Sequence, residues 1–231
     1  MTKAQVLARI HDAGLLPVLR ASSSEQALAL AGALEAGGIT VLEITMTVPG
    51  AVEVIRRLVL EAGDRLLIGA GTVLDPETAR ACMLAGAEFI VSPSLNVKTI
   101  EICQRYGIAV LPGALTPTEV VTAWQAGADV VKVFPCSAVG GAKYLKALKA
   151  PLPQIELIPT GGVSLATASE FLEAGAYALG VGSDLVDAKA IQAGRPESIT
   201  ENARKYRTIV QQARGFSKPA LHSSTEEVRT V

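Results

Sequence analysis

Ala128-Asp129-Val130-Val131-Lys132-Val133-Phe134-Pro135 is a short apolar stretch with a lysine near its middle. The pattern predicts a strand, and period two puts Lys132 on the same face as Val130 and Phe134. Burying an ammonium ion is costly, which favours the neutral amine, and a neutral amine is a nucleophile toward carbonyl carbon. The alternatives are a lysine that reaches solvent from an edge strand, or one that pairs with a buried acid.

The glycine before this strand belongs to a repeat, in which a residue pair ending in glycine precedes an apolar run. The pairs are Gly37-Gly38, Ala62-Gly63, Ala85-Gly86, Tyr106-Gly107, Ala126-Gly127 and Ala174-Gly175. Glycine suits the C-terminal cap of a helix, and the stretches before it have helical apolar spacing, as at Ala27, Leu30, Ala31 and Leu34. The period is about 20 to 25 residues, enough for one helix and one strand.

Helix starts agree with this repeat. Ser24 precedes Glu25, and a capping side chain precedes proline at Asp75-Pro76 and at Thr116-Pro117. Ser164 is expected to open the helix that follows Gly161-Gly162.

The apolar runs show no alternation, which is typical of a parallel sheet covered by helices. The expected strands are Leu15–Arg20, Val41–Thr47, Leu66–Thr72, Glu88–Pro93, Ile108–Gly113, Asp129–Pro135, Gln154–Pro159 and Tyr177–Gly182. Eight strands that alternate with helices predict an α/β protein with a (β/α)₈ TIM barrel. The alternative is a doubly wound sheet, although no GxGxxG of the dinucleotide-binding type follows the first strand.

A single barrel domain is expected over residues 1–213, with a polar tail over residues 214–231. A helix at Thr2–Ala13 would cover the N-terminal end of the barrel, and Ser198–Ala213 would be the last helix. The chain has 231 residues, 49% of them hydrophobic, which suits one large core.

Composition argues against several classes of protein. A net charge of -1, with both signs scattered, gives no sign of a nucleic-acid partner. No apolar run is long enough for a membrane and no signal peptide is recognisable, so a cytoplasmic protein is expected. Three cysteines with no zinc spacing, and only two histidines, argue against a disulfide framework, a metal site and a Ser-His-Asp triad.

Polar groups at the C-terminal ends of the strands are the candidates for chemistry. Glu43 lies between Leu42 and Ile44, and a carboxylate there is costly to bury unless it is paired or used. It is a candidate general acid/base, and the alternative is a structural ion pair, for which Lys132 is one candidate partner. Thr72 follows Gly69-Ala70-Gly71 and offers a hydroxyl to a ligand.

Anion binding is expected at three further strand ends. Arg20 ends the first strand and could clamp a carboxylate or phosphate, or form a salt bridge at the rim. Glycine-rich turns end the seventh and eighth strands, at Pro159-Thr160-Gly161-Gly162-Val163-Ser164 and Gly180-Val181-Gly182-Ser183-Asp184. Barrels commonly bind phosphate at these two positions, although purely steric reasons for the glycines are an alternative.

Taken together, these segments resemble the 2-keto-3-deoxy-6-phosphogluconate (KDPG) and 4-hydroxy-2-oxoglutarate (KHG) aldolase family. The likeness runs from about Gly14 to Asp187. The matching segments are Leu42-Glu43-Ile44-Thr45, Gly69-Ala70-Gly71-Thr72-Val73, Val91-Ser92-Pro93, Pro112-Gly113, Thr116-Pro117-Thr118-Glu119, Lys132-Val133-Phe134-Pro135 and Pro159-Thr160-Gly161-Gly162-Val163.

The resemblance implies a class I aldolase, without metal or cofactor, that assembles as a homotrimer. Lys132 would form the Schiff base and Glu43 would be the acid/base. The other site residues that it implies are Thr72 and Pro93 at the pyruvate end, Phe134 beside the lysine, and Gly161, Gly162, Gly182 and Ser183 around the phosphate. Arg20, Thr47 and Thr160 complete the expected substrate-binding residues.

This chain departs from the family at one position. Many members have an arginine four residues after the glutamate, for the substrate carboxylate, and this chain has Thr47 there. Arg20, on the neighbouring strand, is the candidate replacement.

The small-molecule reaction implied is reversible cleavage of KDPG to pyruvate and glyceraldehyde 3-phosphate. Alternatives are KHG, which gives glyoxylate, or an epimeric phospho sugar acid such as the galactonate-derived one. More distant alternatives are a binding protein without turnover, and an isomerase or epimerase that forms no imine.

Overall fold

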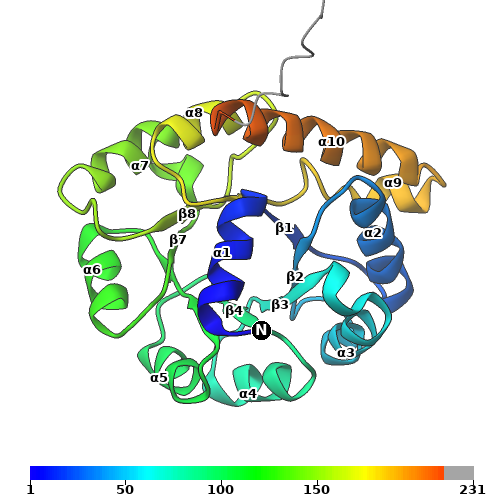
Figure 1. The fold of residues 1–231 in the computed structure, drawn as a ribbon, viewed down its shortest axis with the longest axis horizontal. Coiled ribbons are helices and arrows are strands. Elements are labelled where there is room, and N and C mark those ends of the chain that lie inside the picture. The colour runs from blue at the N-terminus through cyan, green and yellow to red at the C-terminus, as the bar shows by residue number, and fades with distance from the viewer. Residues whose placement is uncertain (216–231) are drawn as a thin grey trace, which may run out of the picture.

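The computed structural model describes residues 1–215 of the chain, and residues 216–231 lie outside it. The polar tail expected at residues 214–231 therefore falls outside the described residues, apart from Arg214 and Gly215. In Figure 1 the helices lie around the outside of the strands, and α1 crosses one end of them.

The strands follow the predicted order and are shorter than predicted. They are β1 (Leu15–Leu19), β2 (Val41–Thr45), β3 (Leu67–Gly71), β4 (Phe89–Val91), β5 (Ala109–Leu111), β6 (Gly113–Ala114), β7 (Val131–Val133), β8 (Leu157–Pro159) and β9 (Leu179–Val181). Each ladder is parallel, with one sheet ordered β5-β4-β3-β2-β1-β9 and another ordered β6-β7-β8. The fold is therefore α/β with a curled parallel sheet.

The predicted strand Ile108–Gly113 is interrupted at Pro112. Proline has no N–H to donate to a ladder, so β5 ends before it and β6 starts after it. The Pro112 carbonyl still accepts a hydrogen bond from the Lys132 N–H at 2.9 Å. This break lets one segment pair with β4 before the proline and with β7 after it.

The helices alternate with the strands. They are α1 (Lys3–Ala13), α2 (Ser24–Ala36), α3 (Ala51–Ala62), α4 (Pro76–Leu84), α5 (Val97–Tyr106), α6 (Pro117–Gln125), α7 (Ala142–Lys149), α8 (Ala168–Glu173), α9 (Ala188–Gln192) and α10 (Pro196–Ala213), with short 3₁₀ turns at Gly63–Arg65 and Cys136–Val139. Asp75 and Thr116 cap α4 and α6 as predicted, whereas Ser23 rather than Ser24 caps α2. The glycine caps are confirmed, as at Gly107, which ends α5 with φ 68°.

The predicted helix start at Ser164 is wrong, because α8 begins at Ala168. The Thr167 hydroxyl accepts a hydrogen bond from the Ser164 N–H at 3.0 Å and donates one to the Gly162 carbonyl at 2.9 Å. These bonds stabilise a turn in place of the first helical residues, since short hydroxyl side chains compete for backbone groups.

Successive residues of a strand alternate between two apolar cores. Val41 and Leu67 belong to an inner cluster that also contains Val6 and Ile10 of α1, whereas Leu42 and Ile68 pack in the outer cluster beneath the helices. Burial on both faces explains why the strands are continuously apolar. Because α1 fills the N-terminal end of the strands, the inward-facing residues further along each strand lie toward the opposite end.

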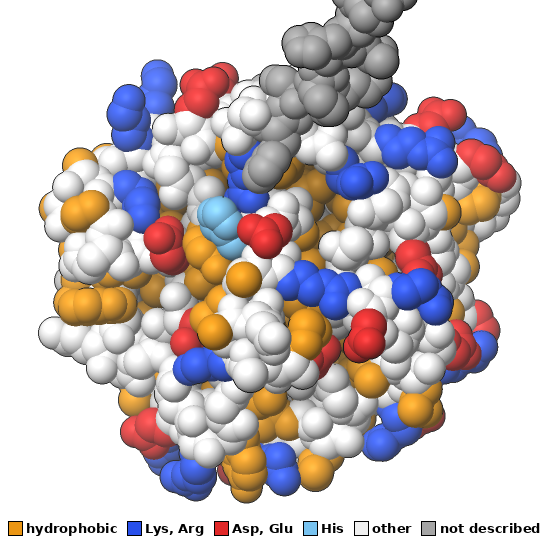
Figure 2. Space-filling view, viewed as in Figure 1, with side chains coloured by type: hydrophobic (Ala, Val, Ile, Leu, Met, Phe, Trp, Pro, Cys, Tyr) orange, Lys and Arg blue, Asp and Glu red, His pale blue; other side chains and the backbone are white. Residues whose placement is uncertain are grey.

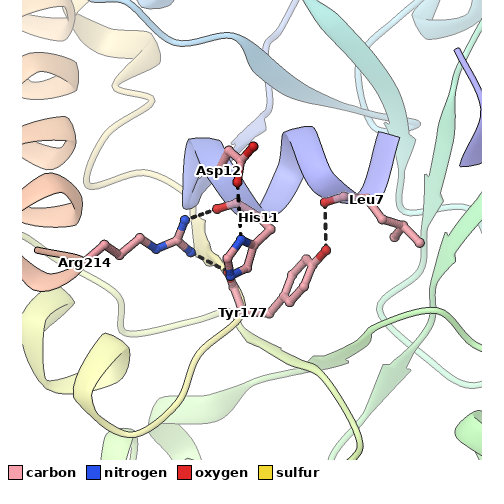
Figure 3. A network of polar contacts seen from close by, with 5 residues as sticks. All are labelled: Leu7, His11, Asp12, Tyr177 and Arg214. Carbon is pink, nitrogen blue, oxygen red and sulfur yellow. Dashed lines mark hydrogen bonds and ion pairs between the residues drawn. The ribbon is translucent and has the colours of Figure 1, made fainter. Parts of the chain in front are cut away.

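A network of polar contacts ties α1 to β9 and α10 (Figure 3). The Tyr177 hydroxyl donates to the Leu7 carbonyl at 2.7 Å. The Arg214 guanidinium donates to the His11 carbonyl and, at 2.7 Å, to the Tyr177 carbonyl. The His11 and Tyr177 rings lie 4.9 Å apart, and His11 also contacts Asp12. Figure 2 shows this end of the molecule, where charged side chains of both signs are interspersed.

Candidate active site

Lys132 and Glu43 meet at the centre of the site. The Lys132 Nζ lies 3.5 Å from the Glu43 Oε1, and the two residues are 4% and 1% exposed. Lys132 comes from β7 and Glu43 from β2, 89 positions apart in the sequence. A buried pair of this kind forms only where the fold brings both side chains to one point.

Strand periodicity explains why both side chains point inward. Val41 lies in the inner cluster, so Glu43, two residues later, faces the same way. Val130 also lies in the inner cluster, so Lys132, two residues later, faces inward as well. The two polar groups therefore form the layer next to the apolar interior, on the side away from α1.

Gly71 makes room for the carboxylate. A Cβ at this position would lie 2.0 Å from the Glu43 Oε1, which is closer than side-chain atoms can approach. The second oxygen, Oε2, is buried and has no hydrogen bond to any described residue. Since buried carboxylate oxygens normally have a partner, Oε2 is available to form a hydrogen bond with a bound molecule.

Phe134 connects the lysine to a pocket of about 330 Å³. Its ring centroid lies 5.7 Å from the Lys132 Nζ, within the range of a cation–π contact. The same ring lines the pocket, so the pocket lies next to the contact between Phe134 and Lys132.

The pocket brings together the two predicted glycine turns. Its lining residues are Arg20, Phe134, Thr160, Gly161, Gly162, Val163, Ser164, Gly180, Gly182, Ser183 and Asp184. Gly162 has φ 78°, and a Cβ there would lie 2.3 Å from the Cβ of Ser137, so no other residue fits without a shift. The backbone N–H groups of Ser183 and Asp184 make no hydrogen bond with the described residues, which leaves them as donors for an anion.

Arg20 lies beside the two glycine turns. Its side chain is exposed and lines the pocket, and a Cβ on Gly182 would lie 3.4 Å from the Arg20 Nη1. Among the described residues Arg20 forms no ion pair, so its guanidinium can contact an anion held by the two turns.

Comparison with known proteins agrees with this geometry. Residues 6–202 match the family described as "Aldolase: KDPG and KHG aldolase". The 2-dehydro-3-deoxy-6-phosphogalactonate aldolase of Escherichia coli K12 is 38% identical over 198 residues, covering 85% of this chain and 96% of the relative. The 2-dehydro-3-deoxy-phosphogluconate aldolase of Haemophilus influenzae is 33% identical, with 91% and 99% covered.

The chain belongs to the KDPG and KHG aldolase family. A solved structure agrees, the KDPG aldolase of Legionella pneumophila with pyruvate captured as a covalent carbinolamine intermediate. It is 34% identical, with a TM-score of 0.80, and the match covers 87% of this chain and 97% of that one. The resemblance first noted in the sequence motifs is thereby confirmed, and the chain is a lyase of the aldolase type.

Thr47 does not replace the arginine of other family members. Thr45 donates its single hydroxyl proton to the Leu19 carbonyl at 2.9 Å. The Thr45 and Thr47 hydroxyl oxygens are 2.7 Å apart, so Thr47 must donate to Thr45. With its proton used in this way, Thr47 has no donor left for a substrate carboxylate.

Thr72 and Pro93 follow β3 and β4, at the same end of the strands as the lysine and the glutamate. Thr72 has φ 57°, the only positive φ of a non-glycine residue within the described part of the chain. Such backbone strain costs about 1–2 kcal/mol, and it clusters at functional sites. The strain supports a functional position for Thr72, and the ligand contacts of both residues remain predictions.

Cys136 follows the lysine strand and has the properties of a structural residue. It is fully buried, and burial raises the pKa of its thiol to about 11. The thiol therefore stays protonated and unreactive at neutral pH.

The rest of the described chain contains other hollows, but no cluster of metal ligands and no helix suited to cross a membrane. In residues 1–215, no three His, Cys, Asp or Glu side chains converge as metal ligands would, and no helix there is long and apolar enough to cross a bilayer. A hollow of about 470 Å³ lies at the N-terminal end between α1 and α10, with Arg9 and Arg207 in its lining. It contains none of the predicted site residues.

The sequence patterns place Asp184 in the turn after the eighth strand but assign it no role, and they do not point to Tyr206. Asp184 lines the pocket beside the two glycine turns, and the Tyr206 hydroxyl donates to its Oδ1 at 3.2 Å. The position of Asp184 directly after Ser183 was the available signal. Nothing in the sequence connects Tyr206 with a turn that lies 22 residues earlier.

Proposed function

We propose that this chain is a class I aldolase that reversibly cleaves KDPG to pyruvate and glyceraldehyde 3-phosphate. The main support for the proposal is the distance of 3.5 Å between the Lys132 Nζ and the Glu43 Oε1, both of which are buried. The pair lies near a pocket with two glycine turns that suit an anion. Passing one proton from Lys132 to Glu43 produces the neutral amine and the carboxylic acid that the first step requires.

The neutral Lys132 amine attacks the C2 ketone to form a carbinolamine, and Glu43 supplies the proton that lets the carbinolamine hydroxyl leave as water. The resulting protonated imine accepts the electron pair of the C3–C4 bond. That bond breaks as Glu43, directly or through water, takes the proton of the C4 hydroxyl. Glyceraldehyde 3-phosphate leaves, the enamine is protonated at C3, and water releases pyruvate and restores the amine.

The phosphate of the substrate is assigned to the turns at Gly161-Gly162 and Gly182-Ser183, and Thr160 to the pocket wall. Backbone N–H groups of the two turns and the Arg20 guanidinium surround this volume. Phe134 packs between the phosphate end and the lysine, while Thr72 and Pro93 are assigned to the pyruvate end.

An epimeric substrate is the second candidate. The Escherichia coli relative with 38% identity is named for the galactonate-derived sugar acid, and this chain lacks the usual arginine at Thr47. KHG is the third candidate and would leave the phosphate turns unused. Comparing kcat/KM for these substrates decides among them, since a site that binds phosphate favours the phosphorylated acids.

The deciding experiment is reductive trapping with pyruvate and borohydride, followed by intact mass and peptide mapping. A pyruvate-sized adduct on Lys132, absent from Lys132→Ala, is the expected result. An adduct only on a surface lysine, or none, would remove class I chemistry and favour a binding protein or an isomerase.

Arg20→Ala is expected to raise the KM for KDPG about tenfold to hundredfold, because a guanidinium contact with phosphate is charge-assisted. Pyruvate trapping on Lys132 should change little. Arg20→Lys keeps the positive charge and loses the two-pronged set of donors, so its KM for KDPG should lie between those of the wild type and Arg20→Ala. If Arg20 holds the substrate carboxylate instead, Arg20→Ala would weaken pyruvate binding as strongly as KDPG binding.

A closed (β/α)₈ barrel in a single domain is the fold best suited to this site. Only Pro112 separates β5 from β6, so the two can be counted as one strand. An isolated parallel bridge between Thr160 and Gly180 connects the end of β8 to β9, and β9 pairs with β1. These contacts support closure around the Lys132–Glu43 pair.

A homotrimer is the proposed assembly. Large apolar side chains are exposed on or beside α4, α5 and α6, namely Leu74, Leu84, Val97, Tyr106 and Trp124. Burying such side chains between protomers is favourable. Light scattering is expected to give about three times the chain mass of 23.9 kDa. A monomeric mass at micromolar concentration would contradict the assembly without affecting the chemistry.

A further inference from the structure

Tyr206 connects an outer helix to the wall of the phosphate pocket. It lies on α10 and is 0% exposed, and its hydroxyl donates to the Asp184 Oδ1 at 3.2 Å. Asp184 follows Ser183 in the turn after β9, where the N–H groups of Leu185 and Val186 both donate to the Gly182 carbonyl. One side-chain hydrogen bond therefore anchors this turn to α10.

The Asp184 carboxylate presents an electrostatic problem. Asp184 is exposed and lines the pocket assigned to a phosphate dianion, where two negative charges repel each other with a strength that solvent reduces. No Lys or Arg of the described residues lies within ion-pair distance of Asp184. Among these residues, the Tyr206 hydroxyl is the side-chain group that holds the carboxylate.

We propose that Tyr206 is a positioning residue for phosphate binding: its hydroxyl holds the Asp184 carboxylate toward α10 and away from the bound phosphate. The same bond keeps the Gly182–Asp184 turn in place, with Ser183 facing the pocket beside Arg20. This inference rests on the assignment of that pocket to phosphate under the proposed function.

Tyrosine suits this task for a physical reason. A buried phenol needs a hydrogen-bond partner, and a carboxylate can only accept, so the direction of the bond is settled. Burial and the nearby Asp184 charge raise the pKa of Tyr206, so the hydroxyl remains a donor at neutral pH. Phenylalanine would fill the same volume and release the carboxylate.

Tyr206→Phe is therefore expected to raise the KM for KDPG roughly fivefold to tenfold, through a charge freed near the phosphate. Its kcat/KM for KHG should stay within about twofold of the wild-type value, because KHG has no phosphate. Tyr177→Phe is the matched control. It removes a partly buried phenol that donates to the Leu7 carbonyl, at the opposite end of β9, and should leave the KM for KDPG unchanged.

A second substitution distinguishes a positioning role of Tyr206 from a role in protein stability alone. In Tyr206→Phe/Asp184→Asn the released group carries no charge, so the KM for KDPG should return to within about threefold of the wild-type value. Asp184→Asn alone keeps an acceptor oxygen for Tyr206 and should bind KDPG at least as well as the wild type. A role limited to stability predicts no rescue by the second substitution.

The affinity for glycerol 3-phosphate, measured by calorimetry, tests the inference without turnover. Weaker binding by Tyr206→Phe and recovery in the double variant would support it, even if wild-type Lys132 forms no imine and the proposed function fails. Unchanged phosphate affinity, an equal loss with KHG, or no recovery in the double variant would overturn it, even if the imine chemistry holds.

Discussion

Lys132→Ala is expected to lower kcat for KDPG cleavage by at least about 10⁴-fold, because no other group in the site can form the imine. The Lys132 Nζ lies 3.5 Å from Glu43 and 5.7 Å from the Phe134 ring centroid, and it is shielded from water. Steady-state kinetics at saturating substrate measure the loss. Lys146→Ala is the matched control, since Lys146 is exposed on α7.

Lys132→Met distinguishes activity lost with the lysine amine from activity lost through unfolding. Removing one member of a buried ion pair costs about 3–5 kcal/mol when the other stays charged, and methionine fills more of the volume than alanine. We expect the same loss of activity from both variants and a smaller loss of stability from Lys132→Met. Residual kcat above about 1% of wild type in a well-folded Lys132→Met would contradict the role of this lysine.

Glu43→Gln is expected to lower kcat by about 10²–10⁴-fold, the range for loss of a general acid/base. Glutamine keeps the shape of the side chain and cannot exchange a proton with the reactant through Oε2, which has no hydrogen bond to a described residue. Pyruvate should still be trapped on Lys132, more slowly, because the nucleophile remains.

Exchange of the pyruvate methyl protons with deuterated water provides a second measurement for Glu43→Gln. This exchange passes through the enamine, so it should fall together with kcat if Glu43 transfers the protons. Glu156→Gln is a suitable control, since Glu156 pairs with Lys149 away from the site. If exchange continued at the wild-type rate, another group would be the acid/base.

Much of the fold could be predicted from local patterns. The glycine caps, the capped helix starts at Asp75 and Thr116, and the apolar runs between them depend on interactions within a few residues. Their order predicted a parallel α/β fold, which is confirmed. Strand and helix ends were less accurate, as at Ser164 and Pro112, because competing local hydrogen bonds and a missing N–H decide them.

The sequence by itself determined which residues could carry the chemistry. A lysine or a glutamate is costly to bury in an apolar strand unless it is paired or takes part in the chemistry. The two-residue alternation of a strand also predicted which face of its strand each side chain occupies. Only the tertiary structure decided that Lys132 lies 3.5 Å from Glu43, that Arg20 lies beside Gly182, and that Tyr206 donates a hydrogen bond to Asp184. The physical reason is distance along the chain: these contacts join separate elements, and no local pattern encodes how strands and helices pack.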